Sequence, residues 1–263
     1  MRVYLEFGRK SFQKMLQYRT ANLAGMATNL FFGAVRVLIF TAFYQASTAK
    51  QPLSLHQVAT YVWLSQSFLM VIRMWGRPEV SDTIRDGSVA MQLTKPVDFQ
   101  FYWLADEFGK STYFLLMRAL PSLLFSIFLF RIMIPADPLT WLAFLTGILL
   151  AVVLNQSYIV AAFSSTFWTL DATGVGGFCF ALQTFFSGFV VPIALWPDWL
   201  QQIASRLPFE GMINFPFSIY LGEVTGVDIL VGFGKQILWI AFFVCIGRWG
   251  IRRGLTKLVL QGG

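Results

Sequence analysis

The chain has 263 residues, of which 56% are hydrophobic and only 13% are charged. Because soluble domains carry about 25% charged residues, this composition excludes a soluble globular protein and indicates an integral membrane protein. The net charge of +7 comes from basic residues that interrupt long apolar runs rather than from one folded basic face, which excludes nucleic acid as a partner.

Residues 1–19 predict an amphipathic helix. At about 100° per residue, one arc of this helix collects charged side chains such as Arg2 and Arg9, and the opposite arc collects apolar side chains such as Phe7 and Phe12. A helix of this kind lies in the headgroup plane of a membrane, with its cations close to anionic lipid. The alternative is a helix that packs on a soluble partner protein.

Six apolar stretches predict transmembrane helices, since a helix that crosses a bilayer needs about 20 mostly apolar residues. Their approximate ranges are 21–46, 50–73 with its apolar centre at 58–72, 111–130, 138–170, 175–195 and 229–247. The predicted fold is therefore an all-α integral membrane protein with six transmembrane helices, in which residues 1–263 form a single domain.

The basic residues predict the orientation of these helices, because cytoplasmic segments carry an excess of Lys and Arg. Fourteen of the 20 Lys and Arg residues fall on one predicted face. They are Arg2, Arg9, Lys10, Lys14, Arg19, Arg73, Arg77, Arg85, Lys95, Lys110, Arg248, Arg252, Arg253 and Lys257. We therefore expect both termini in the cytoplasm and the protein in the plasma (inner) membrane.

The predicted cytoplasmic loop, residues 73–110, is the longest polar stretch and has enough charge to form a docking surface. Pro78 can begin a short helix with acidic residues in its first turn, and Gly87 can end it. We predict this helix over 78–86 and a second short amphipathic helix over 98–108. A plain solvated hairpin is the alternative.

Residues 196–228 form the predicted outer segment before the last span. Prolines break this segment at short intervals, and Trp199 and Ile203 lie at helical spacing between Pro197 and Pro208. A helix of this length is too short to cross a bilayer. We expect the segment to lie at the outer interface or to re-enter the membrane, where irregular backbone must be buried in protein or face water.

Two arginines and three amides within the predicted spans are candidate pathway residues. They are Arg36, Arg118, Asn155, Gln156 and Gln183. A charged side chain is costly inside a bilayer, so the arginines bind either an anionic substrate group or lipid phosphate, or else backbone carbonyls. The amides either line a pathway or join helices through hydrogen bonds.

Other chemistries are poorly supported by the sequence. No predicted span contains an interior Asp, Glu or His, which argues against an enzyme and against an ion-coupled carrier. One His and two Cys are too few for a Cys/His zinc site, and no metal site is expected. Gly109-Lys110-Ser111 is similar to the end of a phosphate-binding loop, but the glycine required five residues earlier is Leu104, so we expect no nucleotide and no cofactor on this chain.

The sharpest motif is the run IRDGSVAMQLTKPV from Ile84 to Val97. It resembles the I-R-x-G … L-x-K-P-V signature of permease subunits of ABC-2 type exporters, in the subgroup in which two different permeases accompany one ATPase. Gln17-Tyr18-Arg19 before the first span and the Pro-Asp-Trp-Leu stretch at 197–200 are also similar to that group. The run departs from the family at 92–94, Gln-Leu-Thr, where apolar residues are more common.

The resemblance implies that the helix over 78–86 is a coupling helix that docks in a groove of a separate ATPase. The residues that it assigns to this contact are Glu79, Asp82, Ile84, Arg85, Asp86 and Gly87. Two ATPase copies would hold ATP and Mg²⁺, a second and different permease would complete the pathway, and membrane lipids would surround both. The implied function is a permease subunit, and not an enzyme, in an exporter for an amphipathic or lipid-like substrate. The alternatives are a membrane scaffold or sensor that binds an ATPase without transport, and an ion-coupled carrier.

Overall fold

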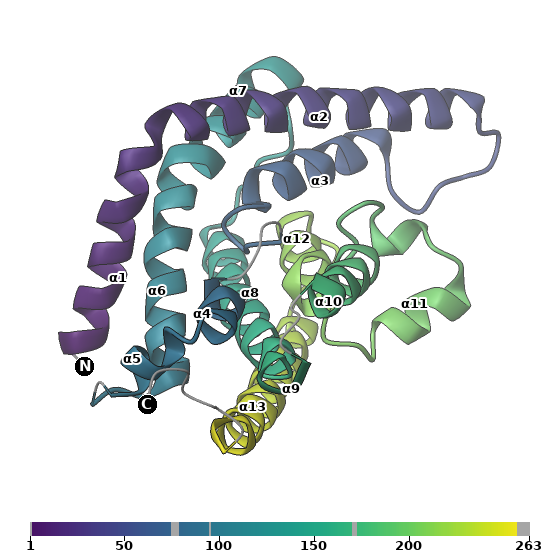
Figure 1. Ribbon diagram of the computed structural model, residues 1–263. Helices are drawn as coiled ribbons and strands as arrows, with labels where there is room; N and C mark the ends of the chain where they lie inside the picture. Colours follow the sequence, from purple (N-terminus) through teal and green to yellow (C-terminus); the bar gives the residue numbers. More distant parts are fainter. Residues whose placement is uncertain (1, 75–78, 95, 170–172, 257–263) are drawn as a thin grey trace.

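The computed structural model describes residues 2–74, 79–94, 96–169 and 173–256. Within these ranges every regular element is a helix and no strand is present (Figure 1). The predicted all-α fold is confirmed.

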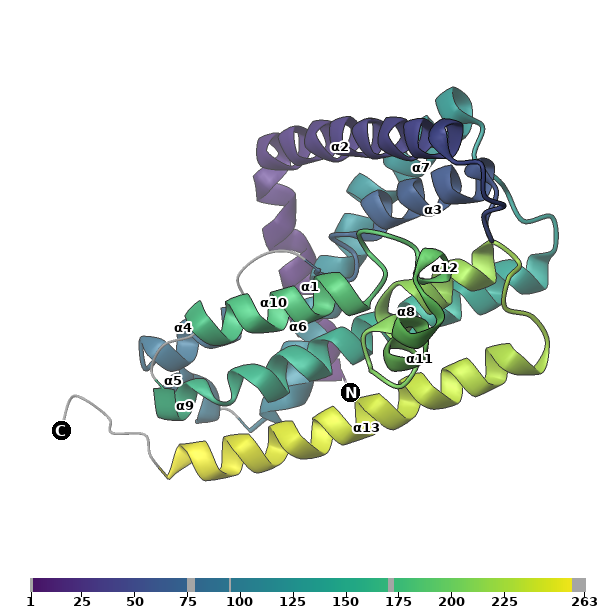
Figure 2. The same ribbon diagram turned by 90° about the vertical axis from the view of Figure 1, so that its right-hand side faces the viewer.

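The N-terminal helix α1 (Arg2–Met15) runs across the direction of the long helix that follows it. A short 3-10 turn, Leu16–Tyr18, redirects the chain into α2 (Arg19–Ala46). Figures 1 and 2 both show this change of direction. The helix predicted at the N-terminus is present.

Four helices are long and apolar enough to cross a membrane. They cover Thr20–Ala46, Phe99–Phe130, Pro138–Thr169 and Val227–Gly254. The second joins α6 (Phe99–Phe114), a π-helical turn (Leu115–Ala119) and α7 (Leu120–Phe130); the third contains α8 (Pro138–Phe163) and α9 (Thr166–Thr169); and the fourth lies within α13 (Val227–Leu255).

The second and fifth predicted spans are shorter than the sequence predicted, so a count of six is not confirmed. α3 (Leu55–Phe68) and α10 (Thr173–Phe186) have 14 residues each. At 1.5 Å per residue this is about 21 Å, less than a hydrocarbon core of about 30 Å. The backbone turns soon after α3, where Arg73 has a φ of 58°, and soon after α10, where Gly188 has a φ of 79°.

The amphipathic helix predicted over 98–108 is not separate from the third span. α6 begins at Phe99, and the Asp98 carboxylate caps it by accepting hydrogen bonds from two backbone N–H groups of its first turn. The helix then continues through the π-helical turn into α7. The helix stays continuous although Pro121 lies at the second residue of α7, directly after the π-helical turn.

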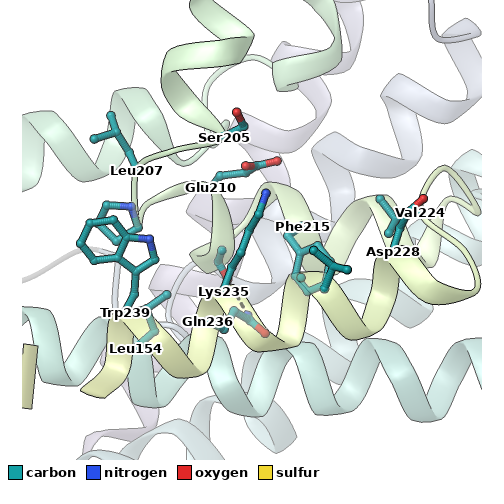
Figure 3. Close-up of a pocket in the computed structure, with 14 residues that line it drawn as sticks. Leu154, Ser205, Leu207, Glu210, Phe215, Val224, Asp228, Lys235, Gln236 and Trp239 are labelled. Atoms are coloured by element: carbon teal, nitrogen blue, oxygen red, sulfur yellow. Dashed lines mark hydrogen bonds between the residues drawn. The ribbon is translucent and has the colours of Figure 1, made fainter. Parts of the chain in front are cut away.

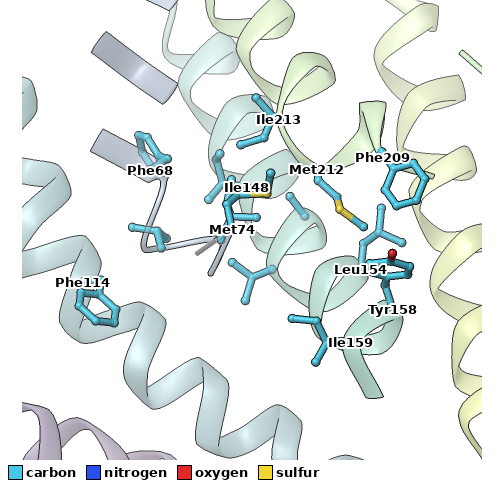
Figure 4. Packing of buried hydrophobic residues seen from close by; sticks show 14 of the residues in the cluster. Phe68, Met74, Phe114, Ile148, Leu154, Tyr158, Ile159, Phe209, Met212 and Ile213 are labelled. Carbon is cyan, nitrogen blue, oxygen red and sulfur yellow. The ribbon is translucent and has the colours of Figure 1, made fainter. Parts of the chain in front are cut away.

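The core is centred on α8, against which α6, α10, α12 (Asn214–Tyr220) and α13 pack. Every residue of α12 is buried. Figure 4 shows part of this packing, in which side chains from the end of α3, from α8 and from the segment before α12 meet. They include Phe68, Met74, Ile148, Leu154, Met212 and Ile213.

The segment before α13 is broken, as predicted. It contains a 3-10 turn (Ile193–Leu195), α11 (Asp198–Ala204), a second 3-10 turn (Glu210–Met212) and α12. α11 leaves Trp199 64% exposed, whereas α12 returns into the core. Irregular backbone in this segment is therefore covered by protein where it reaches the core.

The segments predicted to be cytoplasmic meet at one end of the molecule. The Arg248 guanidinium of α13 donates hydrogen bonds to Gln100 Oε1 at 3.1 Å and to Asp98 Oδ2 at 3.4 Å. The backbone N–H of Asp98 donates to the Tyr4 hydroxyl of α1 at 3.0 Å. The basic parts of α1, α6 and α13 are thus neighbours, as expected of segments that share one side of a membrane.

Candidate functional site

α4 (Glu79–Arg85) corresponds to the short helix predicted over 78–86. Pro78 and the side chain of Arg85 lie outside the part of the chain that the structure describes. The acidic residues of the first turn are Glu79 and Asp82, as predicted.

The face of α4 opposite Glu79 and Asp82 packs against the apolar core of the protein. Ile84 is 4% exposed and belongs to the main apolar core, so its side chain anchors α4 from within. Beyond the helix, Gly87 has a φ of 76°, and Asp86 accepts hydrogen bonds from the backbone N–H and the hydroxyl of Ser88 at 2.9 and 2.6 Å. These contacts fix the turn into α5 (Val89–Leu93).

A partly buried group of charges joins α4 to α1 and α6. Lys110 Nζ lies 2.6 Å from Asp106 Oδ2, one turn earlier on α6, and 2.9 Å from Glu79 Oε1 on α4. The other carboxylate oxygen of Glu79 lies 3.5 Å from Lys14 Nζ on α1. We call these four residues the Lys110 cluster. Since the Lys110 side chain is only 3% exposed, water screens its interactions with the carboxylates weakly.

The charges of the cluster keep Glu79 ionised. Burial opposes ionisation of this carboxyl group, but the charges and hydrogen bonds of Lys110 and Lys14 outweigh it and lower the pKa of Glu79. Glu79 is therefore negative at neutral pH and remains paired with both basic side chains.

A second ion pair and a hydroxyl group extend the cluster. Arg73 Nε lies 2.9 Å from Glu107 Oε1, and the two side chains are 16% and 8% exposed. Ser11 of α1 donates a hydrogen bond to Asp106. Because Arg73 has a left-handed backbone conformation that is uncommon for a residue with a Cβ, its ion pair also stabilises the turn after α3.

α1 and α6 run side by side in the same direction, with their backbones in contact. Aromatic side chains pair along them in order, Tyr4 with Phe101, Phe7 with Tyr102 and Phe12 with Tyr113. A Cβ added to Gly109 would lie 2.0 Å from the carbonyl oxygen of Gly8. The approach that places Lys14 and Ser11 beside α6 therefore requires glycine at position 109.

Arg36 bonds to protein atoms. Its guanidinium donates to Ser65 Oγ at 3.1 Å and to the carbonyl oxygens of Phe189 and Val190 at 2.6 and 2.8 Å, and it lies over the Phe189 ring. Of the two roles considered for this arginine, the structure shows the bonds to backbone carbonyls. They tie α2 and α3 to the turn after α10.

Arg118 lies between α2 and α6. An added Cβ on Gly25 of α2 would lie 1.9 Å from Arg118 Nη2, and the guanidinium is 5.3 Å from the centre of the Phe114 ring. Its Nε is buried and has no hydrogen-bond acceptor among the described residues.

Two of the three candidate amides meet at the turn after α3. Gln183 of α10 donates to Asn155 Oδ1 at 2.6 Å, and Asn155 of α8 donates to the carbonyl oxygen of Ile72 at 2.5 Å. Gln156 is buried on α8 and is 5% exposed. Asn155 thus satisfies a backbone carbonyl of the turn after α3, and Gln183 bonds to the Asn155 side chain, so both amides join helices.

The sequence reasoning identified Glu79 but missed Asp106. It placed Asp106 and Glu107 in a short amphipathic helix before a third span that began at Ser111, and so expected no acid within a span; the observed helix Phe99–Phe130 contains both, and both are buried. The available signal was the i, i+4 spacing of Asp106 and Lys110 in an otherwise apolar stretch.

The described residues contain no group of three His, Cys, Asp or Glu side chains that could hold a metal ion. In the Lys110 cluster, Glu79 of α4 pairs with cations of α6 and α1, and Asp106 pairs with Lys110 on α6 itself. This arrangement suits the cluster to transmit a displacement of α4 to α1 and α6.

Comparison with known proteins gives a family match over most of the chain. Neither the curated proteins nor the solved structures contain a match. The profile of the family described as ABC-2 family transporter protein matches residues 30–262, a range that includes α4, α6 and every later helix. The chain therefore belongs to the ABC-2 family and is a membrane permease component of an ABC transporter, which works with ATPase subunits.

Proposed function

We propose that this chain is the permease subunit of an exporter for an amphipathic or lipid-like substrate. Two copies of a separate ATPase would bind ATP and Mg²⁺, and a second permease of different sequence would complete the pathway. The protein would lie in the plasma (inner) membrane with both termini in the cytoplasm. Family membership supports the permease assignment, and the motif over 84–97 supports pairing with a different permease.

The observation that carries the proposal is the attachment of α4 to two other helices through one carboxylate. Glu79 contacts Lys110 of α6 and Lys14 of α1, while its own side chain remains 44% exposed. The first turn of α4 is therefore open to a partner on one side and joined to the permease on the other.

This attachment suggests how ATP binding acts on the membrane helices. Closure of the two ATPases would displace α4. If Lys110 did not follow, this buried cation would lose one of its two carboxylate partners; because Glu79 is 44% exposed, solvent screening limits the cost to about 1 kcal/mol. α6 would therefore move with α4, and α6 continues into α7. This movement shifts the equilibrium between the two openings of the pathway only if the ATPase binds one arrangement of α4 more tightly than the other.

Replacement of Glu79 by Gln tests this transmission. Glu79→Gln keeps the size of the side chain and removes its charge, and Ile84 still anchors α4. We expect the ATPase to copurify as with the unchanged chain. ATP-dependent movement of a fluorescent phospholipid in liposomes should fall about fivefold, because an ion pair with a half-exposed carboxylate contributes about 1 kcal/mol.

The matched control is Glu6→Gln, which removes an exposed carboxylate of α1 whose partner is Arg9 at 3.7 Å. It should leave transport unchanged. Unchanged transport and hydrolysis in Glu79→Gln would contradict transmission through α4. An ATPase that binds without any ATP-dependent lipid movement would favour a scaffold or sensor, and uptake that follows a proton gradient without ATP would favour an ion-coupled carrier.

A further inference from the structure

A second site lies on the side of α13 that faces the broken segment. A cavity of about 280 Å³ lies between α13 and this segment (Figure 3). Lys235 and Asp228 line it from α13, and Glu210 lines it from the second 3-10 turn. Phe215 and Trp239 supply apolar walls. None of these residues belongs to the Lys110 cluster or to the candidate pathway residues.

The charges around this cavity are not paired with one another. Figure 3 shows the Lys235 side chain extending from α13 toward Glu210, yet among the described residues no salt bridge joins Lys235 to Glu210 or Asp228. Burial raises the pKa of Glu210, although the charge of Lys235 and a hydrogen bond from Asn214 act in the opposite direction. A ligand with a positive group at Glu210 and a negative group at Lys235 would satisfy both.

The floor of the cavity is held in place by Gln236. Its amide nitrogen donates to the carbonyl oxygens of Gly211 at 2.7 Å and Gly147 at 3.1 Å, which joins α13 to the 3-10 turn and to α8. Its Oε1 is buried and has no donor among the described residues. The site is therefore built from fixed elements and holds an acceptor that a hydrogen-bond donor would satisfy.

The surface of α13 next to the cavity is apolar. Val231, Lys235, Leu238 and Phe242 follow one another at helical spacing on one face. Val231, Leu238 and Phe242 are 52%, 65% and 47% exposed. Lys235 thus lies at the junction between a polar cavity and an uncovered apolar stripe, an arrangement that matches a lipid with its headgroup in the cavity.

We propose that this cavity binds the headgroup of an aminophospholipid, whose phosphate contacts Lys235 and whose ammonium group contacts Glu210. The acyl chains then lie along Leu238 and Phe242. Asp228 precedes Lys235 by seven residues, about 10 Å along α13, so a second carboxylate stands on the headgroup side of Lys235. Binding does not depend on whether this lipid is transported.

A primary ammonium group donates hydrogen bonds to carboxylates, whereas a trimethylated ammonium group does not. We therefore expect the purified full-length chain in detergent to bind dihexanoyl-phosphatidylethanolamine about tenfold more tightly than dihexanoyl-phosphatidylcholine or dihexanoyl-phosphatidylglycerol. Native mass spectrometry with lipid titration measures the three affinities. Equal affinities would overturn the proposal, and this comparison requires no variant.

Two variants assign the contacts. Lys235→Gln should weaken binding of all three lipids about tenfold, and Glu210→Gln should remove the preference for phosphatidylethanolamine over phosphatidylcholine. The controls are Lys50→Gln and Asp198→Asn, which change exposed charges outside the cavity and should leave both properties intact. Unweakened binding in Lys235→Gln, or a preference that persists in Glu210→Gln, would overturn the assignment. Because lipid binding is measured without an ATPase, its failure is distinct from failure of the transport proposal.

Discussion

Lys110 is almost fully buried beside two carboxylates from different helices. Its loss would leave Asp106 buried without its cation, and Glu79 would retain only the 3.5 Å contact with Lys14. We expect Lys110→Met to lower the free energy of unfolding by about 3–5 kcal/mol, the cost of breaking a buried pair from one side. Denaturant titration of the purified protein in mild detergent measures this change.

Lys10→Met is the control for this prediction, since Lys10 is an exposed cation of α1. It should change the free energy of unfolding by less than about 0.5 kcal/mol. Equal effects of the two substitutions would contradict the conclusion that water screens the interactions of Lys110 only weakly.

The pH dependence of α4 docking follows from Glu79, whose pKa is lowered in the folded protein by Lys110 and Lys14 against the opposing effect of burial. A carboxyl group whose pKa is lowered on folding stabilises the folded state at pH values above its ordinary pKa, about 4.3. This stabilisation is lost as the pH falls through the lowered pKa. We expect denaturant midpoints to fall less steeply below about pH 4.3 in Glu79→Gln than in the unchanged chain. Parallel pH profiles would contradict a lowered pKa.

At the residue scale, the sequence identified which polar side chains lie among apolar ones, but not what they bind. Arg36 was recognised as costly to bury and Asn155 as a pathway or interhelical amide, and both are buried or partly buried. Their partners are carbonyl groups of turns that come from distant parts of the chain. No local pattern identifies such partners, because only the tertiary arrangement brings them together.

At the scale of elements, the contact between α1 and α6 depends on two glycines. Gly109→Ala would place a Cβ 2.0 Å from the carbonyl oxygen of Gly8, so the helices must separate. We expect a loss of about 1–3 kcal/mol of stability, as in other overpacked contacts, together with weaker ATP-dependent transport. Denaturant titration and the liposome assay measure the two effects.

Gly234→Ala is the matched control, because an added Cβ at this α13 position meets no atom within 4 Å. It should be neutral or stabilise the protein by up to about 1 kcal/mol through helix propensity. If Gly109→Ala were equally neutral, the close approach of α1 and α6 would not matter for stability.

Helix lengths were the least predictable feature of the elements. Apolar composition continues beyond α3 and α10, so the sequence predicted longer helices than the structure contains. The reverse holds for α6, which the polar residues Asp106, Glu107 and Lys110 made appear separate from the third span. Hydropathy indicates which residues avoid water, but it does not indicate where a helix ends. Hydrogen bonds from distant residues stabilise the turns after α3 and α10, and ion pairs allow charged residues within α6.

At the scale of the whole molecule, the distribution of basic residues predicts that α4 and α11 lie on opposite sides of the membrane. Single cysteines at Ser88 and Asp198, in a chain whose Cys179 and Cys245 are replaced by Ser, test this. We expect a membrane-impermeant thiol reagent to label Asp198→Cys in intact cells and Ser88→Cys only after the membrane is opened. The reverse pattern would contradict the predicted orientation.

The sequence by itself determined that this is an all-α membrane protein of the ABC-2 family with a short helix after α3, because composition, charge distribution and a local motif carry that information. The low charge content indicates that the protein lies in a membrane, and the motif over 84–97 indicates its family. Only the tertiary structure decided that Glu79, Lys14, Asp106 and Lys110 form one cluster, and that Glu210 and Lys235 face one cavity. Their interactions join residues as many as 65 positions apart along the chain, and such proximity depends on how the helices pack rather than on any segment alone.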